Sequence, residues 1–290
     1  MDLVIQSEDL PSDAVAAFRV ALDAPRPARK TNAARLARVD GGPQNHEIAE
    51  ALAKYWNCDA CFVPEALSAR TMRVLVMDMD STLVTIEGID ELAGLAGKGA
   101  EVAAITEAAM RGEITDYSSS LRKRVALLAG ADAALIEQVI AERMQLSPGA
   151  LELLENARAF GWKTLLVSGG FTQFAKAVQE QTGIDEICAN ELEIQDRRIT
   201  GLVAGPAEHD RQVIDAAGKA RALQRFCERH GCSPKQAIAV GDGANDIEMM
   251  AIAGLSVAYH AKPRTKERAT YALDFTGLDG IPRLFADVWD

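Results

Sequence analysis

The segment Val74–Thr82 reads VLVMDMDST, an apolar run that ends in two carboxylates one residue apart. A short aliphatic run of this kind is typical of a buried strand in a parallel sheet. Because side chains alternate along a strand, Asp78 and Asp80 would point the same way if the strand geometry persisted. Two like charges that close would force one carboxyl to keep its proton, unless a bound divalent cation offsets the repulsion. The plainer alternative is a turn after a strand, in which Asp and Ser are common.

The composition is that of a soluble globular chain, with 290 residues, 48% hydrophobic and 25% charged. No apolar run approaches the length that crosses a bilayer, and the first residues do not resemble a signal peptide, so we expect a cytoplasmic protein. The net charge of −11 argues against nucleic acids and anionic membranes as partners, since both attract basic surfaces. A small anionic substrate stays open if cations line its pocket, and so does a homodimer.

From Arg73 onward, short apolar runs alternate with helical patterns, which predicts βαβ units and a parallel sheet covered on both faces. The expected strands are Val74–Met77, Thr164–Val167, Ala237–Val240 and Leu255–Ala258. The expected helices are Pro148–Phe160, Phe171–Thr182, Lys219–His230 and Asn245–Ala253. A hairpin formed by Glu191–Gln195 and Arg198–Val203 interrupts this alternation.

A run of helical segments without a good strand separates the first strand from Pro148. These segments are Ile89–Ala96, Gly99–Met110, Tyr117–Leu128 and Asp132–Arg143. An insertion directly after the first strand lies over the carboxyl edge of the sheet, where ligands bind in such folds. We therefore expect residues 89–146 to form a helical lid, and residues 71–88 and 147–290 to form the core beneath it.

Residues 1–70 are expected to form a separate small α/β module. Its expected parts are a strand-like Leu3–Ile5, a helix-like Ala14–Ala21, a polar loop rich in Pro, Arg and Asn, a helix His46–Tyr55 and an apolar Cys61–Val63.

Two further expected strands end in residues that suit the binding of a metal ion or an anion. The segment Ala239–Asp246 reads AVGDGAND, in which glycines let the backbone bend or approach a ligand. Its side chains Asp242, Asn245 and Asp246 offer the oxygen ligands that Mg²⁺ prefers. The segment Leu166–Gly170 reads LVSGG, and its hydroxyl, with free N–H groups at the following helix start, would suit an anion. Taken alone, each segment could be only a tight turn.

Lys219 begins the helix before the Ala237–Val240 strand, and a lone lysine there is ordinarily a surface charge. All four signals, however, fall at the carboxyl end of an expected strand or at the start of the next helix, so the fold would bring them together. An acid pair, metal ligands, a hydroxyl donor and a lysine are the components of phosphoryl transfer through a carboxylate nucleophile.

The motifs DxDST, SGG, a lysine and GDGxND, in this order, resemble those of the haloacid dehalogenase-like phosphatases. Within that superfamily, Asp78–Glu91, Ser120–Val125 and Val167–Phe171 look like the phosphoserine phosphatase family. The resemblance implies an α/β fold with a three-layer Rossmann-like parallel sheet core and a helical cap inserted after the first core strand. It runs from Arg73 to Ala269. Residues 1–70 lie outside it, and because many bacterial relatives carry an ACT-like module there, we expect a degenerate one.

The resemblance also implies roles for the motif residues. Asp78 would attack phosphorus and become an aspartyl phosphate, while Asp80 would protonate the leaving hydroxyl and later deprotonate water. Mg²⁺ would be held by Asp78, the backbone carbonyl of Asp80 and Asp242, with Asp246 in support. The residues expected to contact phosphate are Ser168, Gly169, Lys219 and Asn245.

Substrate choice is expected to come from the lid side. Glu87 would receive the substrate ammonium and Arg124 its carboxylate, which an arginine fork binds bidentately. Met110 and Tyr117 would close over the ligand, with Tyr117 in place of the more usual phenylalanine. Without the resemblance, the run Arg122–Arg124 would be only a basic turn of a solvated helix.

The expected function is Mg²⁺-dependent hydrolysis of O-phospho-L-serine to L-serine and phosphate, the last step of serine biosynthesis. One alternative is a phosphatase or phosphotransferase of the same superfamily that acts on another small phosphate monoester. The other is a non-catalytic phosphoserine-binding regulator. The intact acid pair argues against a regulator, because a binding protein has no need for Asp80.

Overall fold

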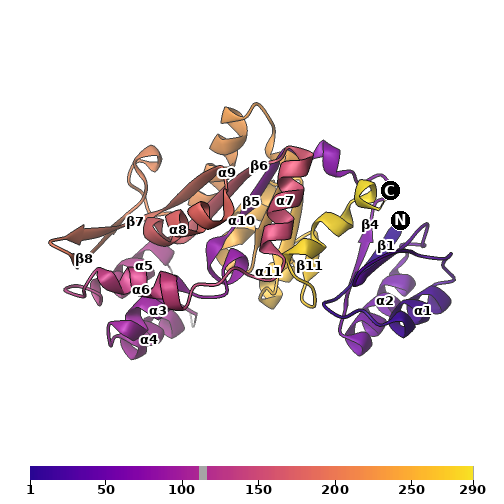
Figure 1. The fold of residues 1–290 in the computed structure, drawn as a ribbon, viewed down its shortest axis with the longest axis horizontal. Helices are drawn as coiled ribbons and strands as arrows, with labels where there is room; N and C mark the ends of the chain where they lie inside the picture. The colour runs from indigo at the N-terminus through magenta and orange to yellow at the C-terminus, as the bar shows by residue number, and fades with distance from the viewer. Residues whose placement is uncertain (111–115, 290) are drawn as a thin grey trace.

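The computed structural model describes residues 1–110 and 116–289, and these fold around two β-sheets (Figure 1). The larger sheet has seven strands in the order β11-β10-β9-β5-β6-β7-β8. Its strands are β5 Val74–Met77, β6 Lys163–Phe171, β7 Glu186–Gln195, β8 Arg198–Ala204, β9 Ala237–Gly241, β10 Leu255–Tyr259 and β11 Tyr271–Leu273. All neighbours are parallel except β7 and β8, which form the expected antiparallel hairpin. The predicted α/β class with a parallel core sheet is confirmed.

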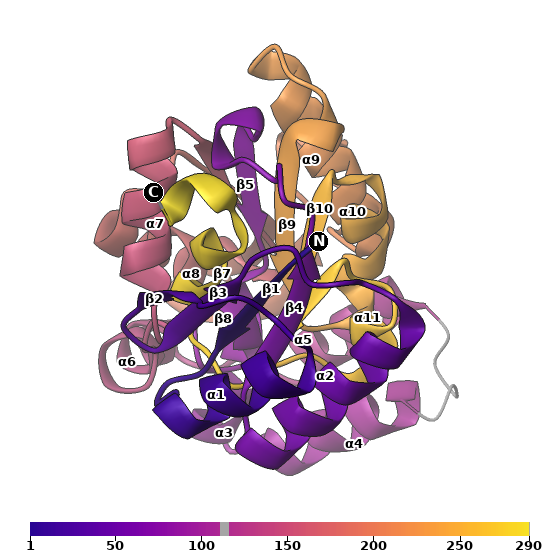
Figure 2. The same cartoon turned by 90° about the vertical axis from the view of Figure 1, so that its right-hand side faces the viewer.

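The central strand β5 is covered on both faces, and all four of its residues are 0% exposed. The helices of the core are α7 Ala150–Phe160, α8 Thr172–Thr182, α9 Ala216–Arg229, α10 Ile247–Ile252 and α11 Pro263–Lys266. Leu75 and Met77 belong to the hydrophobic cluster that contains α7 and α8, whereas Val74 and Val76 belong to the cluster of α9 and α10. Figure 2 shows α7 and α10 on opposite sides of β5 and β9. The unbroken aliphatic run of β5 follows from this three-layer packing.

A helical cap follows β5 in the chain. Its helices are α3 Gly88–Leu95, α4 Gly99–Met110, α5 Tyr117–Ala126 and α6 Ala134–Glu142. The cap lies beside the β7–β8 hairpin, at the end of the molecule opposite the N-terminal sheet (Figure 1). The loop after α5 is bonded to that hairpin, because Gly130 N–H donates to the carbonyl of Ile199 (2.8 Å) and Ile199 N–H donates to that of Ala131 (2.9 Å). Among the described residues, no helix has both the length and the apolar character needed to cross a membrane.

The N-terminal sheet is antiparallel, with strand order β2-β3-β1-β4. Its elements are β1 Asp2–Gln6, α1 Ser12–Ala21, β2 Ala28–Lys30, β3 Ala33–Leu36, α2 Pro43–Trp56 and β4 Asp59–Val63. The expected polar loop between the two helices is wrong, because part of it forms the β2–β3 hairpin. All of β2 is exposed, and β3 buries alanines and Arg35, whose Nε donates to Asp2 (2.8 Å). Neither strand therefore shows the alternation of apolar and polar residues that predicts a half-buried strand.

Asp59 connects the N-terminal sheet to the segment that follows β11. The side chain is 5% exposed, and its carboxylate accepts hydrogen bonds from the N–H groups of Asp274 (2.7 Å) and Phe275 (3.1 Å). A further bond runs from Glu8 N–H to the carbonyl of Phe275 (2.7 Å). Burial raises the pKa of Asp59 to about 7, although the two N–H donors oppose that shift. The protonation of one carboxyl is therefore coupled to the contact between the two sheets.

Replacing Asp59 by Asn tests this coupling. Because the pKa of about 7 in the folded protein lies above the ordinary 3.8, the unfolded chain loses the proton first. The wild-type protein therefore loses stability as the pH rises from about 4 to about 7. We expect Asp59→Asn to gain stability relative to wild type across this window, by about 1.4 kcal/mol for each pKa unit that burial imposes. Urea unfolding at pH 5 and pH 8 measures the difference.

Asp185→Asn is the matched control. The burial of Asp185 is outweighed by hydrogen bonds from Thr164 and Lys163, which hold the pKa of its carboxyl below the usual value. Its charge therefore stabilises the fold above about pH 4, and this variant should lose similar stability at pH 5 and pH 8. If the stability difference between Asp59→Asn and wild type is the same at pH 5 and pH 8, the Asp59 carboxyl of the wild-type protein is ionised in the folded state at both pH values.

Candidate active site

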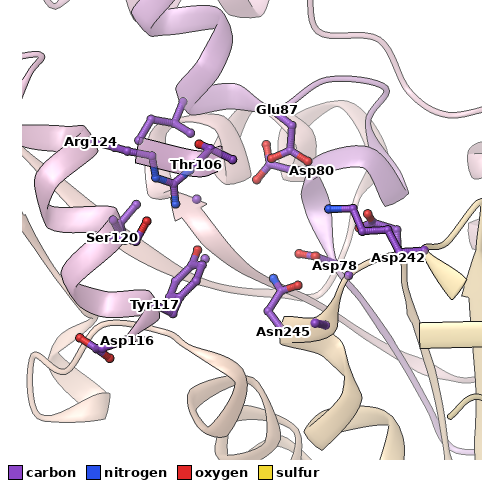
Figure 3. A pocket seen from close by; sticks show the side chains of 17 residues that line it. Asp78, Asp80, Glu87, Thr106, Asp116, Tyr117, Ser120, Arg124, Asp242 and Asn245 are labelled. Atoms are coloured by element: carbon purple, nitrogen blue, oxygen red, sulfur yellow. The ribbon is translucent and has the colours of Figure 1, made fainter. Parts of the chain in front are cut away.

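A cavity of about 390 Å³ lies between the cap and the carboxyl ends of the central strands (Figure 3). Figure 3 places Arg124, Tyr117 and Ser120 on one side of it and Asp78 and Asp242 on the other. Eight of the predicted site residues line the cavity: Asp78, Asp80, Glu87, Tyr117, Arg124, Gly169, Asp242 and Asn245. Three more lie behind this lining with 0% exposure: Ser168, Lys219 and Asp246. The predicted edge of the sheet therefore does carry the cavity.

Asp78 and Asp80 reach the cavity through a turn. The strand ends at Met77, and the chain then forms a π-type turn over Met79–Leu83. Within it, Ser81 takes the left-handed conformation, with φ of 53°. The strand therefore ends where the sequence predicts, and strand geometry does not persist as far as Asp80. Both carboxylates nevertheless line the same cavity.

The Asp80 carboxylate is held by two hydrogen bonds. One oxygen accepts from the N–H of Gly88 (2.8 Å), and the other accepts from the hydroxyl of Ser168 (3.3 Å). Burial, followed by the negative charge of Glu87, raises the pKa of Asp80 to about 7. A carboxyl with a pKa near neutrality can both give and accept a proton during one reaction cycle.

Lys219 forms a buried ion triad with two carboxylates. Its Nζ lies 2.7 Å from an oxygen of Asp78 and 2.8 Å from an oxygen of Asp246. Burial opposes the charged ammonium, but the charges of Asp246 and Asp78 outweigh it and raise the pKa of Lys219 above its usual range. The interpretation of this lysine as a solvated surface charge is therefore wrong. Its predicted contact with phosphate stays a proposal.

Three carboxylates could hold a metal ion. One oxygen each of Asp78, Asp242 and Asp246 lies within 4.8 Å of the others. Burial, followed by the negative charge of Asp246, raises the pKa of Asp242 to about 6. Gly241 is needed beside it, because an added Cβ would lie 2.3 Å from the carboxyl carbon of Asp246. Among the described residues, the side chain of Asp80 is not part of the group, so only its backbone carbonyl stays a predicted ligand.

The cap contributes the far side of the cavity. Among the described residues, the Nε of Arg124 is buried without a hydrogen-bond partner. Burial raises the pKa of Tyr117 to about 12, so its hydroxyl keeps its proton, and this group lies over Gly169, where an added Cβ would be 2.1 Å away. Glu87 accepts a hydrogen bond from the hydroxyl of Ser81 (2.8 Å). The side chain of Met110, which was predicted to close over the ligand, lies outside the described residues.

Several lining residues were not predicted, among them Thr106, Asp116, Ser120, Leu121 and Lys262. Helical spacing could have found two of them, because positions 117, 120, 121 and 124 share one face of α5. No sequence signal pointed to Lys262, which follows the end of β10 at Tyr259.

Comparison with known proteins supports a hydrolase site. The family model described as haloacid dehalogenase-like hydrolase matches residues 75–251. A phosphoserine phosphatase of Polaromonas sp. is 49% identical over 218 residues, which cover 75% of this chain and 92% of that protein. A phosphoserine phosphatase of Haemophilus influenzae is 45% identical over 208 residues, which cover 72% of this chain and 64% of that protein.

Solved structures are similar over nearly the whole chain. A probable phosphoserine phosphatase from Vibrio cholerae superposes with a TM-score of 0.83 at 34% identity, covering 99% of this chain and 88% of that one. A hydrolase of the same family from Salmonella enterica gives a TM-score of 0.86 at 29% identity, with 99% of both chains covered. A substrate-bound phosphoserine phosphatase gives 0.67 at 35% identity, covering 74% of this chain and 98% of that one.

Divalent cations should stabilise the protein through the three-carboxylate cluster. A ligand that binds the folded state alone raises the Tm, and relief of carboxylate repulsion adds to the effect. We expect added Mg²⁺ to raise the Tm of the wild-type protein, and Asp242→Asn to lose most of that rise. Thermal unfolding with Mg²⁺ and with a chelator measures both effects.

Asp196→Asn is the control. It removes one negative charge at an exposed position in the β7–β8 turn, and it should keep the full rise in Tm on addition of Mg²⁺. Equal shifts in both variants would place the cation elsewhere.

Proposed function

Since the chain belongs to the haloacid dehalogenase-like hydrolases, we propose that it is a cytoplasmic, Mg²⁺-dependent phosphoserine phosphatase. It would hydrolyse O-phospho-L-serine to L-serine and phosphate, the last step of serine biosynthesis. The observation that carries this proposal is the arrangement of the cavity. The acid pair Asp78 and Asp80 lies at one side, and the buried, unpaired Nε of Arg124 lies at the other. A small molecule with a phosphate at one end and a carboxylate at the other matches both sides.

The acid pair supplies the chemistry in two steps. The Asp78 carboxylate attacks phosphorus, the bond from phosphorus to the serine oxygen breaks, and Asp80 gives its proton to that oxygen. Asp80 then takes a proton from water, which attacks the aspartyl phosphate and releases phosphate and free Asp78. The pKa of about 7 and the two hydrogen bonds at Asp80 support this double role.

The residues that would hold Mg²⁺ are all oxygen donors, as this hard cation prefers. They are the carboxylates of Asp78 and Asp242 and the backbone carbonyl of Asp80, with Asp246 in support. When bound, the cation neutralises charge on the phosphate and on the carboxylates that face it.

The remaining contacts divide between the two ends of the substrate. Phosphate oxygens would be bound by the Ser168 hydroxyl, the Gly169 N–H, Lys219 and Asn245. At the other end, Glu87 would accept the ammonium, Arg124 would donate to the carboxylate, and Met110 and Tyr117 would exclude water. In this proposal residues 89–146 are the lid, residues 71–88 and 147–290 the catalytic core, and residues 1–70 a separate module.

Phosphate release from a panel of small phosphate monoesters, with and without Mg²⁺, tests the proposed reaction. We expect O-phospho-L-serine to be the best substrate, and Asp78→Asn to lower kcat by about 10⁴-fold or more, because the nucleophile is lost. An unchanged circular dichroism spectrum would confirm that the variant is folded. Retained activity would refute the assignment of Asp78 as the nucleophile.

The same assays separate the alternatives. Stoichiometric transfer to an added alcohol such as homoserine would refute the hydrolase assignment, and phosphoserine binding without turnover would indicate a regulator.

Arg124→Ala tests the carboxylate contact. A lost hydrogen bond to a charged group is worth about 1.5–3 kcal/mol, or about 10- to 150-fold in kcat/KM. We expect that loss with O-phospho-L-serine and little change with p-nitrophenyl phosphate, which has no carboxylate. Arg124→Lys should recover only part of it, since an ammonium lacks the planar fork. Arg122→Ala, exposed on the same helix, is the control and should leave both substrates unchanged. Equal losses on both substrates would exclude a carboxylate-binding role.

A further inference from the structure

Asn190 is a buried polar residue that lies outside the cavity lining. It is located in β7 with 0% exposure, and both ends of its side-chain amide are bonded. Its Nδ2 donates to the carbonyl of Gly169 (2.8 Å), and its Oδ1 accepts from the N–H of Ile214 (2.8 Å). The residue therefore links the irregular part of β6, residues Ser168–Gly170, to the segment that leads into α9.

The bulge of β6 at Ser168–Gly170 needs this link. The pairing of β6 with β7 is regular up to Val167 and resumes at Phe171, opposite Asn190, after a shift in register. A bulge of this kind leaves its extra residues without partners in the ladder. A buried carbonyl without a partner is costly, and the Nδ2 of Asn190 supplies the partner for Gly169.

The same peptide unit orients the Ser168 hydroxyl. The peptide between Gly169 and Gly170 is held at both ends, since its carbonyl accepts from Asn190 and its N–H donates to the Oγ of Ser168 (2.8 Å). A serine hydroxyl has one proton, and Oγ uses it to donate to the carboxylate of Asp80 (3.3 Å) while it accepts from the N–H of Gly170. A chain of hydrogen bonds thus runs from Asn190 to Asp80.

The other end of the amide acts on α9. Ile214 precedes Asp215, whose side chain accepts from the N–H of Gly218 (2.7 Å) and caps the helix. Lys219 is the next residue, and its ammonium contacts Asp78. The spacing between the bulge of β6 at Ser168–Gly170 and Lys219 is therefore set through one buried side chain.

We propose that Asn190 is a positioning residue for phosphoryl transfer, which fixes the Ser168–Gly170 bulge and Lys219 relative to the acid pair. This inference rests on the proposed phosphatase function. It assigns no contact with substrate to Asn190. Removal of the amide should misplace groups that act on the reacting atoms, and a misplacement of about 1 Å far from the chemistry can lower a rate by about 100-fold.

Asn190→Leu and Asn190→Asp test the inference with O-phospho-L-serine. The leucine variant keeps the size but makes no hydrogen bond, and we expect kcat per folded molecule to fall by about 100-fold. In the aspartate variant, a protonated carboxyl can donate to Gly169 and accept from Ile214, whereas an ionised carboxyl cannot donate. Its kcat relative to wild type should therefore rise as the pH falls. The folded fraction is measured at each pH, so that loss of stability is separated from loss of rate.

Gln173→Leu is the matched control. Its Nε2 also donates to a carbonyl of β7, that of Leu192 (3.2 Å), but among the described residues no hydrogen bond connects it to the cavity. It should alter stability and leave kcat and its pH profile unchanged. A kcat per folded molecule in Asn190→Leu within about threefold of wild type would overturn the inference. If that variant does not fold, the inference would be overturned by a kcat of Asn190→Asp, relative to wild type, that does not change with pH. Failure of the proposed function is distinct, because the wild-type protein itself would then release no phosphate.

Discussion

The burial of the Lys219 ammonium between Asp78 and Asp246 is the interaction on which the rest of the site depends. Taking three charges out of water is unfavourable unless each is paired and hydrogen-bonded, and here the lysine lies 2.7 and 2.8 Å from its two partners. The triad joins three separate parts of the chain, namely the end of β5, the first turn of α9 and the turn after β9. Loss of Lys219 would leave two buried carboxylates without their cation, whereas loss of either aspartate would leave a single ion pair.

The parallel sheet explains why these charges can meet at all. Its strands are aliphatic and buried on both faces until they reach their carboxyl ends, where polar residues begin together. Backbone groups near these ends also donate hydrogen bonds, such as the N–H of Gly88 at the start of α3 toward Asp80. The acid pair thus has a rigid apolar support below it and a cap of helices above it, which is the arrangement in which a carboxyl pKa is most easily raised.

Much of this organisation could be predicted from the sequence, because hydrophobic periodicity and strand-end motifs are local signals. β5 and α4 have the bounds that the pattern predicts, and the strand-end motifs do meet at one edge of the sheet. The β2–β3 hairpin was missed because its few buried residues are mostly alanine and arginine. The positioning role proposed for Asn190 could not be predicted either, since an asparagine in a strand is informative only once the bulge opposite it is known. The buried state of Lys219 likewise depends on partners that are far away in the sequence.

The main-chain bonds from Gly130 and Ala131 to Ile199 attach the C-terminal end of α5 to a hairpin of the core sheet. Arg124 lies in the last turn of that helix, whereas Tyr117 begins it. The position of the Arg124 guanidinium relative to Asp78, the proposed nucleophile, is thus held by the framework of the sheet, because both residues are attached to it. A ligand held at both ends is selected by its length, so a homologue with one additional methylene would place its phosphorus atom out of line with Asp78.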